Sequence, residues 1–346
     1  MKKFLSIIER VVMKLLKHKS AIIFSSFILV FSLLNTTAFA KDFSNKKNVN
    51  LFIQEMVKKH RFNKKHLTTL FAEAKLYNSI LEAIARPAES KPWYQYRPIF
   101  VTKKRTQGGI AFWKKNAAAL ARAEKKYGIP QEIIVAIIGV ETRYGKHAGR
   151  YPVFDALATL AFAYPPRAKF FKSELEQFLL MTREEKIAPK KLLGSYAGAM
   201  GMPQFISSSF RRYAVDFDGD GKRDLWNNTT DAIGSVANYF RKHHWKTGQP
   251  ITQKVEVYGE KLNNLISKKL KPSHSLTELR NNGVLLPSVT KEHGKGKLLK
   301  LNTKQEPEYW VAWNNFYVIT RYNHSALYSM AVYQLSQKIK QGYLNL

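Results

Sequence analysis

The 346-residue chain contains no cysteine. A disulfide framework and a lipid-modified N-terminal cysteine are therefore both excluded, although exported proteins can use either. The sequence also contains no internal repeat and no low-complexity tract, which excludes a repeat architecture. Hydrophobic residues at 45% and aromatic residues at 13% suffice for packed cores, and the length allows two or three domains. The composition therefore predicts a globular protein.

Acidic residues are scarce. The chain has 25 Asp and Glu against 57 Lys and Arg, which gives a formal net charge of +32. Such an excess implies a polyanionic partner, such as nucleic acid, an anionic membrane surface or an acidic cell-wall polymer. The positive charge is spread through the chain, and a generally basic proteome would also produce it. The charge supports a function but does not identify one.

The first forty residues have the composition of an export signal. A basic segment, MKKFLSIIERVVMKLLKHK, precedes the apolar run AIIFSSFILVFSLL, and Ala38-Phe39-Ala40 has the small-x-small form of a signal-peptidase site. An uncleaved membrane anchor is the alternative, because the basic region is long and neighbouring residues could extend the apolar run. Either interpretation predicts a periplasmic protein, which disfavours nucleic acid as the partner.

Apolar residues recur at helical spacing through most of the remaining chain, which predicts a mainly α protein of the α+β class. Residues 48–86 form a series of short amphipathic stretches. The segment KPWYQYRPIFVTKKR contains Pro92 and Pro98, and we expect an ordered connector there instead of a regular helix. A long helix is expected from about Ile110 to Tyr127.

Between about Ile251 and Val318 the pattern changes to short alternating runs, namely QKVEVYG, GKLLKLN, EYWVAW and NFYVIT. These runs predict a small β-rich insert, followed by a closing helix from Ser325 onward. The expected organisation is an export signal at 1–40, a helical domain at 41–109, a core at 110–249, a small β-rich domain at 250–305, and a segment at 306–346 that closes the core and the helical domain.

One carboxylate stands in an unexpected place, within the string IIVAIIGVETRYGKHAG. In a helix through this string, Glu141 falls on the same face as Ile134 and Ile138, which is the face used for burial. Burial and the nearby C-terminal end of the helix dipole both raise the pKa of such a carboxyl. A proton donor near neutral pH suits the protonation of a leaving oxygen in glycoside cleavage. The alternative is a structural Glu that is salt-bridged to Arg143 or another basic residue.

A glycine-rich cluster follows in LLGSYAGAMGMPQFISSSF. It combines Gly194, Gly198 and Gly201 with Ser195 and Gln204, and so much glycine is not typical of a core helix. Glycine allows a ligand to approach the backbone closely. A serine nucleophile is not indicated, because the G-x-S-x-G elbow is absent.

The string DFDGDGKRDLWNNTTD has the residue types of an EF-hand-like calcium loop. Position 12 of this loop holds Asn227 instead of the usual bidentate Glu, so the last ligand must come from elsewhere, and Asp231 is the nearest carboxylate. An acidic turn without metal is the alternative. The expected ligands at positions 1, 3, 5, 7 and 9 are Asp216, Asp218, Asp220, the carbonyl of Lys222, and Asp224.

Several long blocks occur in a characteristic order: GVETRYGKHAGRYPVFDALATLAF, SYAGAMGMPQFISSSFRRYAVDFDGDGKRDLW, DAIGSVANYF and NFYVITRYNHSALYSMAVYQL. Together they resemble the membrane-bound lytic murein transglycosylase B family. The resemblance runs from about Phe52 to Gln337, includes KPWYQYRPIFVT, and is weakest from about 250 to 305. It implies a lysozyme-like catalytic core with an EF-hand loop, flanked by a helical domain and a small β domain.

The resemblance implies cleavage of the β-1,4 bond between N-acetylmuramic acid and N-acetylglucosamine, which leaves a 1,6-anhydromuramic end. Glu141 would protonate the departing oxygen and then deprotonate the muramoyl 6-hydroxyl. An ordinary glycosidase needs two carboxyl groups, about 5 to 9.5 Å apart. Asp155 is the nearest second candidate in the sequence, but we expect it to cap a short apolar helix. A single acid and base with an internal sugar nucleophile therefore fits the sequence better.

The resemblance also implies roles for polar and aromatic residues. Ser195 and Gln204 would contact substrate near the reacting sugar, and four further residues would line the cleft, where tyrosine rings offer apolar faces for sugars. Core packing is the alternative for each tyrosine. In the calcium loop the resemblance supports Asp216, Asp218, Asp220, Lys222 and Asp231. The cleft residues are Tyr96, Tyr322, Asn323 and Tyr328.

The expected partner is peptidoglycan, because its stem peptides and lactyl-linked carboxylates are anionic. No nucleic acid partner and no organic cofactor are expected, and we expect a monomer. Contacts with the membrane surface or with wall-synthesis proteins stay open. A hydrolytic muramidase and a non-catalytic wall-binding protein are the competing functions.

Overall fold

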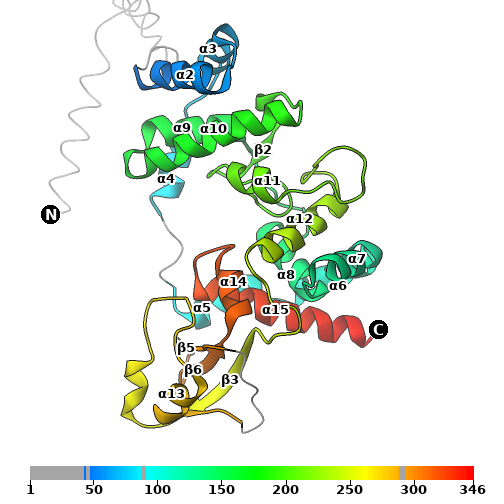
Figure 1. Cartoon of the computed structure of the whole chain (residues 1–346), viewed down its shortest axis with the longest axis vertical. Helices are drawn as coiled ribbons and strands as arrows, with labels where there is room; N and C mark the ends of the chain where they lie inside the picture. Colours follow the sequence, from blue (N-terminus) through cyan, green and yellow to red (C-terminus); the bar gives the residue numbers. More distant parts are fainter. Residues whose placement is uncertain (1–42, 44–46, 87–90, 288–293) are drawn as a thin grey trace, which may run out of the picture. The chain divides into compact units, whose positions relative to one another are not determined.

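The computed structural model describes residue 43 and residues 47–86, 91–287 and 294–346. The predicted export signal at 1–40 lies outside the described residues. Helices dominate the described part of the chain, with one four-stranded sheet and one two-stranded sheet (Figure 1). The prediction of a mainly α fold of the α+β class is therefore confirmed. The division into domains stays a prediction.

Aromatic side chains join two of the first three helices to each other and to a later helix. They are α2 (Lys47–His60), α3 (Lys64–Ala72) and α4 (Asn78–Ile84), and α4 packs on α9 (Val153–Ala163). The ring centroids of Phe52 and Phe71 lie 5.9 Å apart, and Phe71 lies 5.1 Å from Phe154 of α9. Tilted and edge-on aromatic pairs of this kind add to the gain from burial. Helix α9 in turn packs along α10 (Ala168–Glu184), as Figure 1 shows.

The segment with two prolines forms a helix and not a connector. Helix α5 spans Trp93–Phe100, with Pro92 as its N-cap and Pro98 inside it. Proline is tolerated just before the first turn, and the helix ends only two residues after Pro98, so little of the hydrogen-bond ladder is lost. The prediction that these prolines exclude a regular helix was wrong.

The expected long helix is two helices, α6 (Lys103–Lys115) and α7 (Ala117–Tyr127). They are separated at Asn116, which leaves helical geometry and donates its side-chain amide to the carbonyl of Phe112 at 2.8 Å. Such local side-chain bonds compete with the helical ladder. The expected end near Tyr127 is confirmed, because Gly128 caps α7 in a left-handed conformation with φ of +73°.

Helix α8 (Gln131–Thr142) carries Glu141 through the interior. Every residue from 132 to 140 is buried, because α6, α7, α12 (Thr229–Lys242) and α15 (Ala326–Leu344) all pack around this helix. The sequence pattern predicted burial of only one face of this helix, whereas the structure buries all of its faces. Glu141 lies at the end of a helix that is buried on all sides.

Short elements connect these helices. The strand pair β1 (Tyr151–Pro152) and β2 (Leu193–Gly194) is antiparallel, and α11 (Ser207–Tyr213) precedes α12. Two 3-10 turns lie here, η1 (Pro165–Arg167) and η2 (Pro189–Lys191). Pro152 is the N-cap of α9, so the predicted capping role of Asp155 was wrong. Asp155 lies inside the first turn, where it is buried.

The β-rich insert is an antiparallel sheet in the order β4-β3-β6-β5. It has its own small core, which includes Val255, Leu298 and Val311. The elements are β3 (Thr252–Val257), β4 (Val284–Leu285), β5 (Lys297–Leu301) and β6 (Glu308–Ala312), together with η3 (Glu260–Asn264) and α13 (Leu276–Asn281).

The predicted strand NFYVIT is wrong, because these residues belong to α14 (Asn314–Thr320). The buried amide of Asn315 donates to the carbonyls of Lys246 and Gln249 at 2.8 and 3.0 Å. These long-range bonds favour a helix that the alternating sequence pattern alone does not indicate. The closing helix is confirmed, since Ser325 caps α15 by accepting from the Tyr328 amide.

Within the described part of the chain, no helix is both long enough and apolar enough to cross a membrane.

Candidate active site

Glu141 and Tyr328 form the centre of the candidate site. Glu141 stands in the last turn of α8, and Tyr328 stands in the first turn of α15. The Tyr328 hydroxyl donates to Oε1 of Glu141 at 2.5 Å. Tyr328 is buried, with 3% of its surface exposed, whereas Glu141 keeps an intermediate exposure. The carboxyl is thus enclosed by protein and still reachable.

Burial raises the pKa of Glu141 to about 7, and the hydrogen bond from Tyr328 acts in the opposite direction. The first cause dominates because desolvation disfavours the charged carboxylate. Half of the Glu141 carboxyls would therefore carry a proton near neutral pH. The predicted direction of the pKa shift agrees with the structure, although the principal cause is desolvation.

No basic side chain among the described residues forms an ion pair with Glu141, so the alternative of a bridge to Arg143 is not supported. The pKa of Glu141 responds to burial and to Tyr328, and to no second carboxylate in the described part of the chain. Tyr328 donates to Oε1, and Oε2 has no hydrogen-bond partner within the described residues.

The backbone after Glu141 is held in an unusual conformation. Arg143 and Tyr144 both have positive φ, of 51° and 64°. Non-glycine residues rarely adopt this geometry, and it persists only where surrounding contacts enforce it. The Tyr144 hydroxyl donates to the carbonyl of Arg105 at 2.6 Å, and the Thr142 hydroxyl donates to the carbonyl of Met202 at 2.9 Å. The first bond fixes the segment after α8 to α6, and the second fixes the end of α8 to the glycine-rich loop.

The glycine-rich loop presents Ser195 and Gln204 with part of their bonding capacity unused. The Ser195 hydroxyl oxygen accepts from the amides of Ala197 and Ala199 at 3.3 and 3.0 Å, so its own proton stays available for a ligand. The Gln204 side chain donates to the carbonyls of Ala148 and Gly201 at 3.0 and 2.9 Å. Its Oε1 then stays available as an acceptor. Both residues have intermediate exposure.

Aromatic residues build one wall beside Glu141. Tyr322 donates its hydroxyl to the carbonyl of Pro203 at 2.6 Å, and its ring lies 4.8 Å from that of Tyr239. Burial raises the pKa of Tyr322, with a further contribution from the Glu141 charge, which places this ring close to the carboxyl. Tyr96 of α5 contributes to the raised pKa of Tyr328 and therefore also lies nearby.

Asn323 follows Tyr322 and has intermediate exposure. Its backbone carbonyl accepts from the Ser325 amide at 2.7 Å, while its side chain makes no hydrogen bond within the described residues. The amide side chain therefore has both donors and its acceptor free for a ligand. The structure brings Tyr96, Tyr322 and Tyr328 together near Glu141, and Asn323 is adjacent in sequence.

The acidic loop gathers three of its carboxylates. Oxygens of Asp216, Asp218 and Asp231 lie within 4.8 Å of one another. Asp231 is fully buried and accepts from the amides of Phe217 and Asp224 at 2.7 and 2.8 Å. Burial raises its pKa, and the charges of Asp218 and Asp216 raise it further. A cation would relieve this repulsion, so the donor set fits a calcium ion.

The remaining loop residues are arranged differently. Asp220 accepts from the Lys222 amide at 2.9 Å and is not part of the three-carboxylate group. Asp224 accepts from the amides of Trp226 and Asn227 at 2.8 and 2.9 Å, which stabilises a turn. The role of Lys222 and Asp220 as ligands stays a prediction.

The sequence has clear relatives. Residues 44–337 match the transglycosylase SLT domain family. The chain belongs to this family. It is 43% identical over 315 residues to membrane-bound lytic murein transglycosylase B of Escherichia coli, covering 88% of this chain and 86% of that protein. The family includes lytic transglycosylases, so the predicted family, the lytic transglycosylase activity and the enzyme class are confirmed.

Solved SLT-family structures agree with the fold. Catenated lytic transglycosylase SltB1 of Pseudomonas aeruginosa superposes with a TM-score of 0.84 at 49% identity, covering 87% of this chain and all of that chain. Lytic transglycosylase Slt35 of E. coli, solved in complex with calcium, superposes with a TM-score of 0.81 at 42% identity. The match covers 88% of this chain and 96% of that chain. SltB3 of P. aeruginosa was solved with NAG-anhNAM-pentapeptide, with a TM-score of 0.75 at 31% identity and 84% and 78% covered.

Several residues that shape this SLT-family site had no signal in the sequence. Thr142 joins the end of α8 to the glycine-rich loop, and Tyr239 packs on Tyr322. The direct bond from Tyr328 to Glu141 joins residues 187 positions apart. The resemblance suggested Tyr328 as a residue of the cleft, but no periodicity or spacing could have paired it with the acid.

Proposed function

We propose that Glu141 is the single general acid and base of a lytic transglycosylase that cleaves the β-1,4 bond between N-acetylmuramic acid and N-acetylglucosamine. The observation that carries this proposal is the geometry of one carboxyl group. Glu141 has a pKa of about 7, a tyrosine donor on Oε1, and no second carboxylate that affects it within the described residues. Such a group can both give and take a proton near neutral pH.

In the reaction, Glu141 first donates a proton and later accepts another. Oε2 of Glu141 protonates the glycosidic oxygen, the bond to the muramoyl C1 breaks, and N-acetylglucosamine departs with the proton. The resulting carboxylate then takes the proton of the muramoyl 6-hydroxyl, whose oxygen forms the new bond to C1. The product is a 1,6-anhydro ring, no water is consumed, and Glu141 ends protonated as it began.

Tyr328 stabilises the carboxylate form that Glu141 takes between the two proton transfers. A hydroxyl donor strengthens its bond to an oxygen that becomes charged, so Tyr328 offsets part of the desolvation cost when Glu141 is a carboxylate. Gln204 Oε1, the Ser195 hydroxyl and the Asn323 side chain are the free polar groups that would hold the sugar. The rings of Tyr96 and Tyr322 would pack against its apolar faces.

The acidic loop would hold calcium as a structural ion. Asp216, Asp218 and Asp231 supply its carboxylates, and the loop also contains Asp220 and the Lys222 carbonyl. Buried Asp231 stands in the first turn of α12, which packs on α8. The ion would therefore stabilise α12, which packs against the helix that carries Glu141, and would take no part in the chemistry.

We also propose a periplasmic location, because the substrate is the cell wall and residues 1–40 have the composition of an export signal. The net charge of +32 would favour encounter with an anionic wall.

Mass spectrometry of the products tests the reaction type. Purified peptidoglycan is digested with the protein and the products are weighed. Anhydro ends are lighter than hydrolysed ends by one water molecule, ~18 Da, because the 6-hydroxyl attacks C1 in place of water. We expect anhydro ends throughout. Products with only reducing ends would identify a hydrolytic muramidase and overturn the proposed mechanism.

A further inference from the structure

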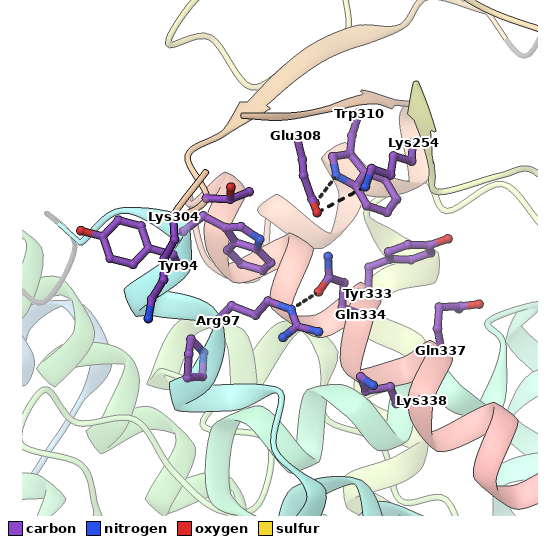
Figure 2. A pocket seen from close by; sticks show the side chains of 13 residues that line it. Tyr94, Arg97, Lys254, Lys304, Glu308, Trp310, Tyr333, Gln334, Gln337 and Lys338 are labelled. Carbon is purple, nitrogen blue, oxygen red and sulfur yellow. Dashed lines mark hydrogen bonds and ion pairs between the residues drawn. The ribbon is translucent and has the colours of Figure 1, made fainter. Parts of the chain in front are cut away.

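A cavity that Glu141 does not line is found where α5, α15 and the strands β3 and β6 meet (Figure 2). Its volume is about 670 Å³. This is large enough for three or four amino-acid residues, since ligand pockets of roughly 300 to 1,000 Å³ hold small molecules of that size. We call it the basic pocket, after the cations that line it. These cations are Arg97, Lys254, Lys304 and Lys338.

The walls of the basic pocket are joined to one another. The Tyr94 amide of α5 donates to the carbonyl of Asn302 at 3.1 Å, between β5 and β6. Arg97 Nε of α5 donates to Oε1 of Gln334 on α15 at 2.6 Å, a bond that Figure 2 shows. The three supporting elements are thus fixed in place by direct contacts, which makes the pocket a built feature of the fold.

The aromatic side of the pocket offers an apolar surface. The rings of Trp310 and Tyr333 lie 6.2 Å apart at an interplanar angle of 77°. Trp93 is buried, with 3% of its surface exposed, and Tyr94 is 36% exposed. Such walls accept methyl groups and backbone segments of a ligand.

The charges in the pocket are unbalanced. Glu308 is the acidic lining residue, and its Oε1 lies 3.3 Å from Lys254 Nζ, while its Oε2 accepts from Trp310 Nε1 at 3.3 Å. Arg97, Lys304 and Lys338 have no ion-pair partner within the described residues. Three cations therefore stay unpaired around a mixed apolar and polar cavity.

We infer that the basic pocket binds a carboxylate-bearing peptide of the kind that hangs from the muramoyl groups of peptidoglycan, an inference that rests on the proposed function. A stem peptide brings several carboxylates together with small methyl side chains. The carboxylates match Arg97, Lys304 and Lys338, and the methyl groups match Trp310 and Tyr333. A peptide-free glycan strand would leave these cations mostly unpaired.

Binding here leaves the catalytic centre open. Gln337 of the pocket follows Tyr328 by nine residues, which is about two and a half turns of α15 and therefore the opposite side of the helix. A stem peptide held in the basic pocket would keep wall material close to Glu141. Tethering of this kind raises the effective concentration of substrate without a change in the chemical step.

The binding test uses an N-acetylated stem tetrapeptide without sugars, titrated calorimetrically into the full chain. The variant is Lys304→Glu with Lys338→Glu, and the control is Lys58→Glu with Lys125→Glu, which makes the same charge change at exposed positions on α2 and α7. We expect the pocket variant to bind at least about tenfold more weakly and the control to stay within about twofold of the parent. All four lysines are exposed, and unchanged melting temperatures would verify folding.

Equal weakening in both variants, or no binding by the parent chain, would overturn the inference. Peptide-free glycan that competes for the pocket as well as the tetrapeptide would overturn it too. In a second assay, the pocket variant should raise KM about fivefold on intact peptidoglycan and leave kinetics on peptide-free glycan unchanged. A chain that binds the tetrapeptide but releases no anhydro products would refute the proposed function alone.

Discussion

The two ends of α8 carry two glutamates with opposite environments. Glu132, in the first turn, forms an ion pair with Lys340 at 2.9 Å and lies near the positive end of the helix dipole. Glu141, in the last turn, has Tyr328 as its hydrogen-bond donor and no ion pair within the described residues. Burial in one helix therefore does not decide the state of a carboxyl. The interaction partner and the helix end differ between Glu132 and Glu141, and a raised pKa is resolved for Glu141.

The largest contrast should appear when each glutamate is replaced by its amide. Glu141→Gln removes the transferable proton and keeps the shape, so we expect lytic activity to fall by roughly 10³-fold or more. Glu132→Gln removes an ion pair far from the chemistry, so activity should stay within about twofold while stability falls by about 1 kcal/mol. Turbidity loss of a peptidoglycan suspension and thermal melting measure both effects.

Melting of the Glu141→Gln variant also has an expected pH dependence. Between pH 4.5 and 7 the unfolded state loses the Glu141 proton while the folded state keeps it, so this group destabilises the parent fold progressively as pH rises. Glutamine does not titrate. The variant should therefore be at least as stable as the parent at pH 8. Its free energy of unfolding should increase less than that of the parent when the pH is lowered from 8 to 4. Retained lysis by a folded Glu141→Gln variant would refute the role of this residue.

Replacing Tyr328, the partner of Glu141, should have a different effect from replacing Lys340, the partner of Glu132. Tyr328→Phe keeps the ring but removes the hydroxyl that orients Glu141, so we expect kcat to fall by roughly tenfold to 100-fold. The pKa of Glu141 should rise, because the lost hydrogen bond lowers it in the parent. The alkaline limb of the pH profile should then move upward. Lys340→Met is the matched control, and its profile should not move; equal shifts in both variants would contradict the role of Tyr328.

The pH profile of the parent enzyme follows from the protonated fraction of Glu141. With a pKa of about 7, kcat/KM should fall through neutral pH as the proton donor is lost, and by pH 8 about a tenth of the donor is left. Initial lysis rates from pH 5 to 9 at constant ionic strength provide the measurement. A rate that still increases from pH 7 to 9 would mean that a different group supplies the proton.

The acidic loop should have the smallest effect on activity. Three of its carboxylates lie within 4.8 Å of one another, whereas no second carboxylate affects the pKa of Glu141 within the described residues. Removal of calcium with a chelator should lower the melting temperature by about 5 °C and change kcat at 25 °C by less than about twofold. Asp231→Asn should abolish the calcium response, and Asp224→Asn, whose carboxylate caps a turn, should keep it. An unchanged melting temperature on calcium addition would indicate a loop without metal.

The sequence predicted local features well where residue chemistry dominates. Gly128 ends α7, Ser325 caps α15, and the alternating runs that became β3, β5 and β6 were found. It failed at two helices, at α5 for a local reason and at α14 because distant contacts compete with local preference. Pro98 is tolerated near the end of α5, and Asn315 holds α14 by bonds to the 246–249 segment.

The candidate site shows the same division. Glu141 was selected because an acid among isoleucines is conspicuous, and the family resemblance added the cleft residues; their roles stay predictions. The spacing left the last acidic ligand undecided, and the structure places Asp231 beside Asp216 and Asp218. The basic pocket had no sequence signal, because its cations come from four separate elements or turns.

The helical class, the family and the choice of Glu141 as the candidate acid followed from the sequence alone. Residue types, short spacings and ordered sequence blocks carry this information. The surroundings of Glu141 depend on the tertiary structure. Four helices bury α8, Tyr328 arrives from 187 residues away, and no cation pairs with Glu141 among the described residues. The pKa of a carboxyl depends on desolvation and on its neighbours in space, and neither can be read from the order of residues alone.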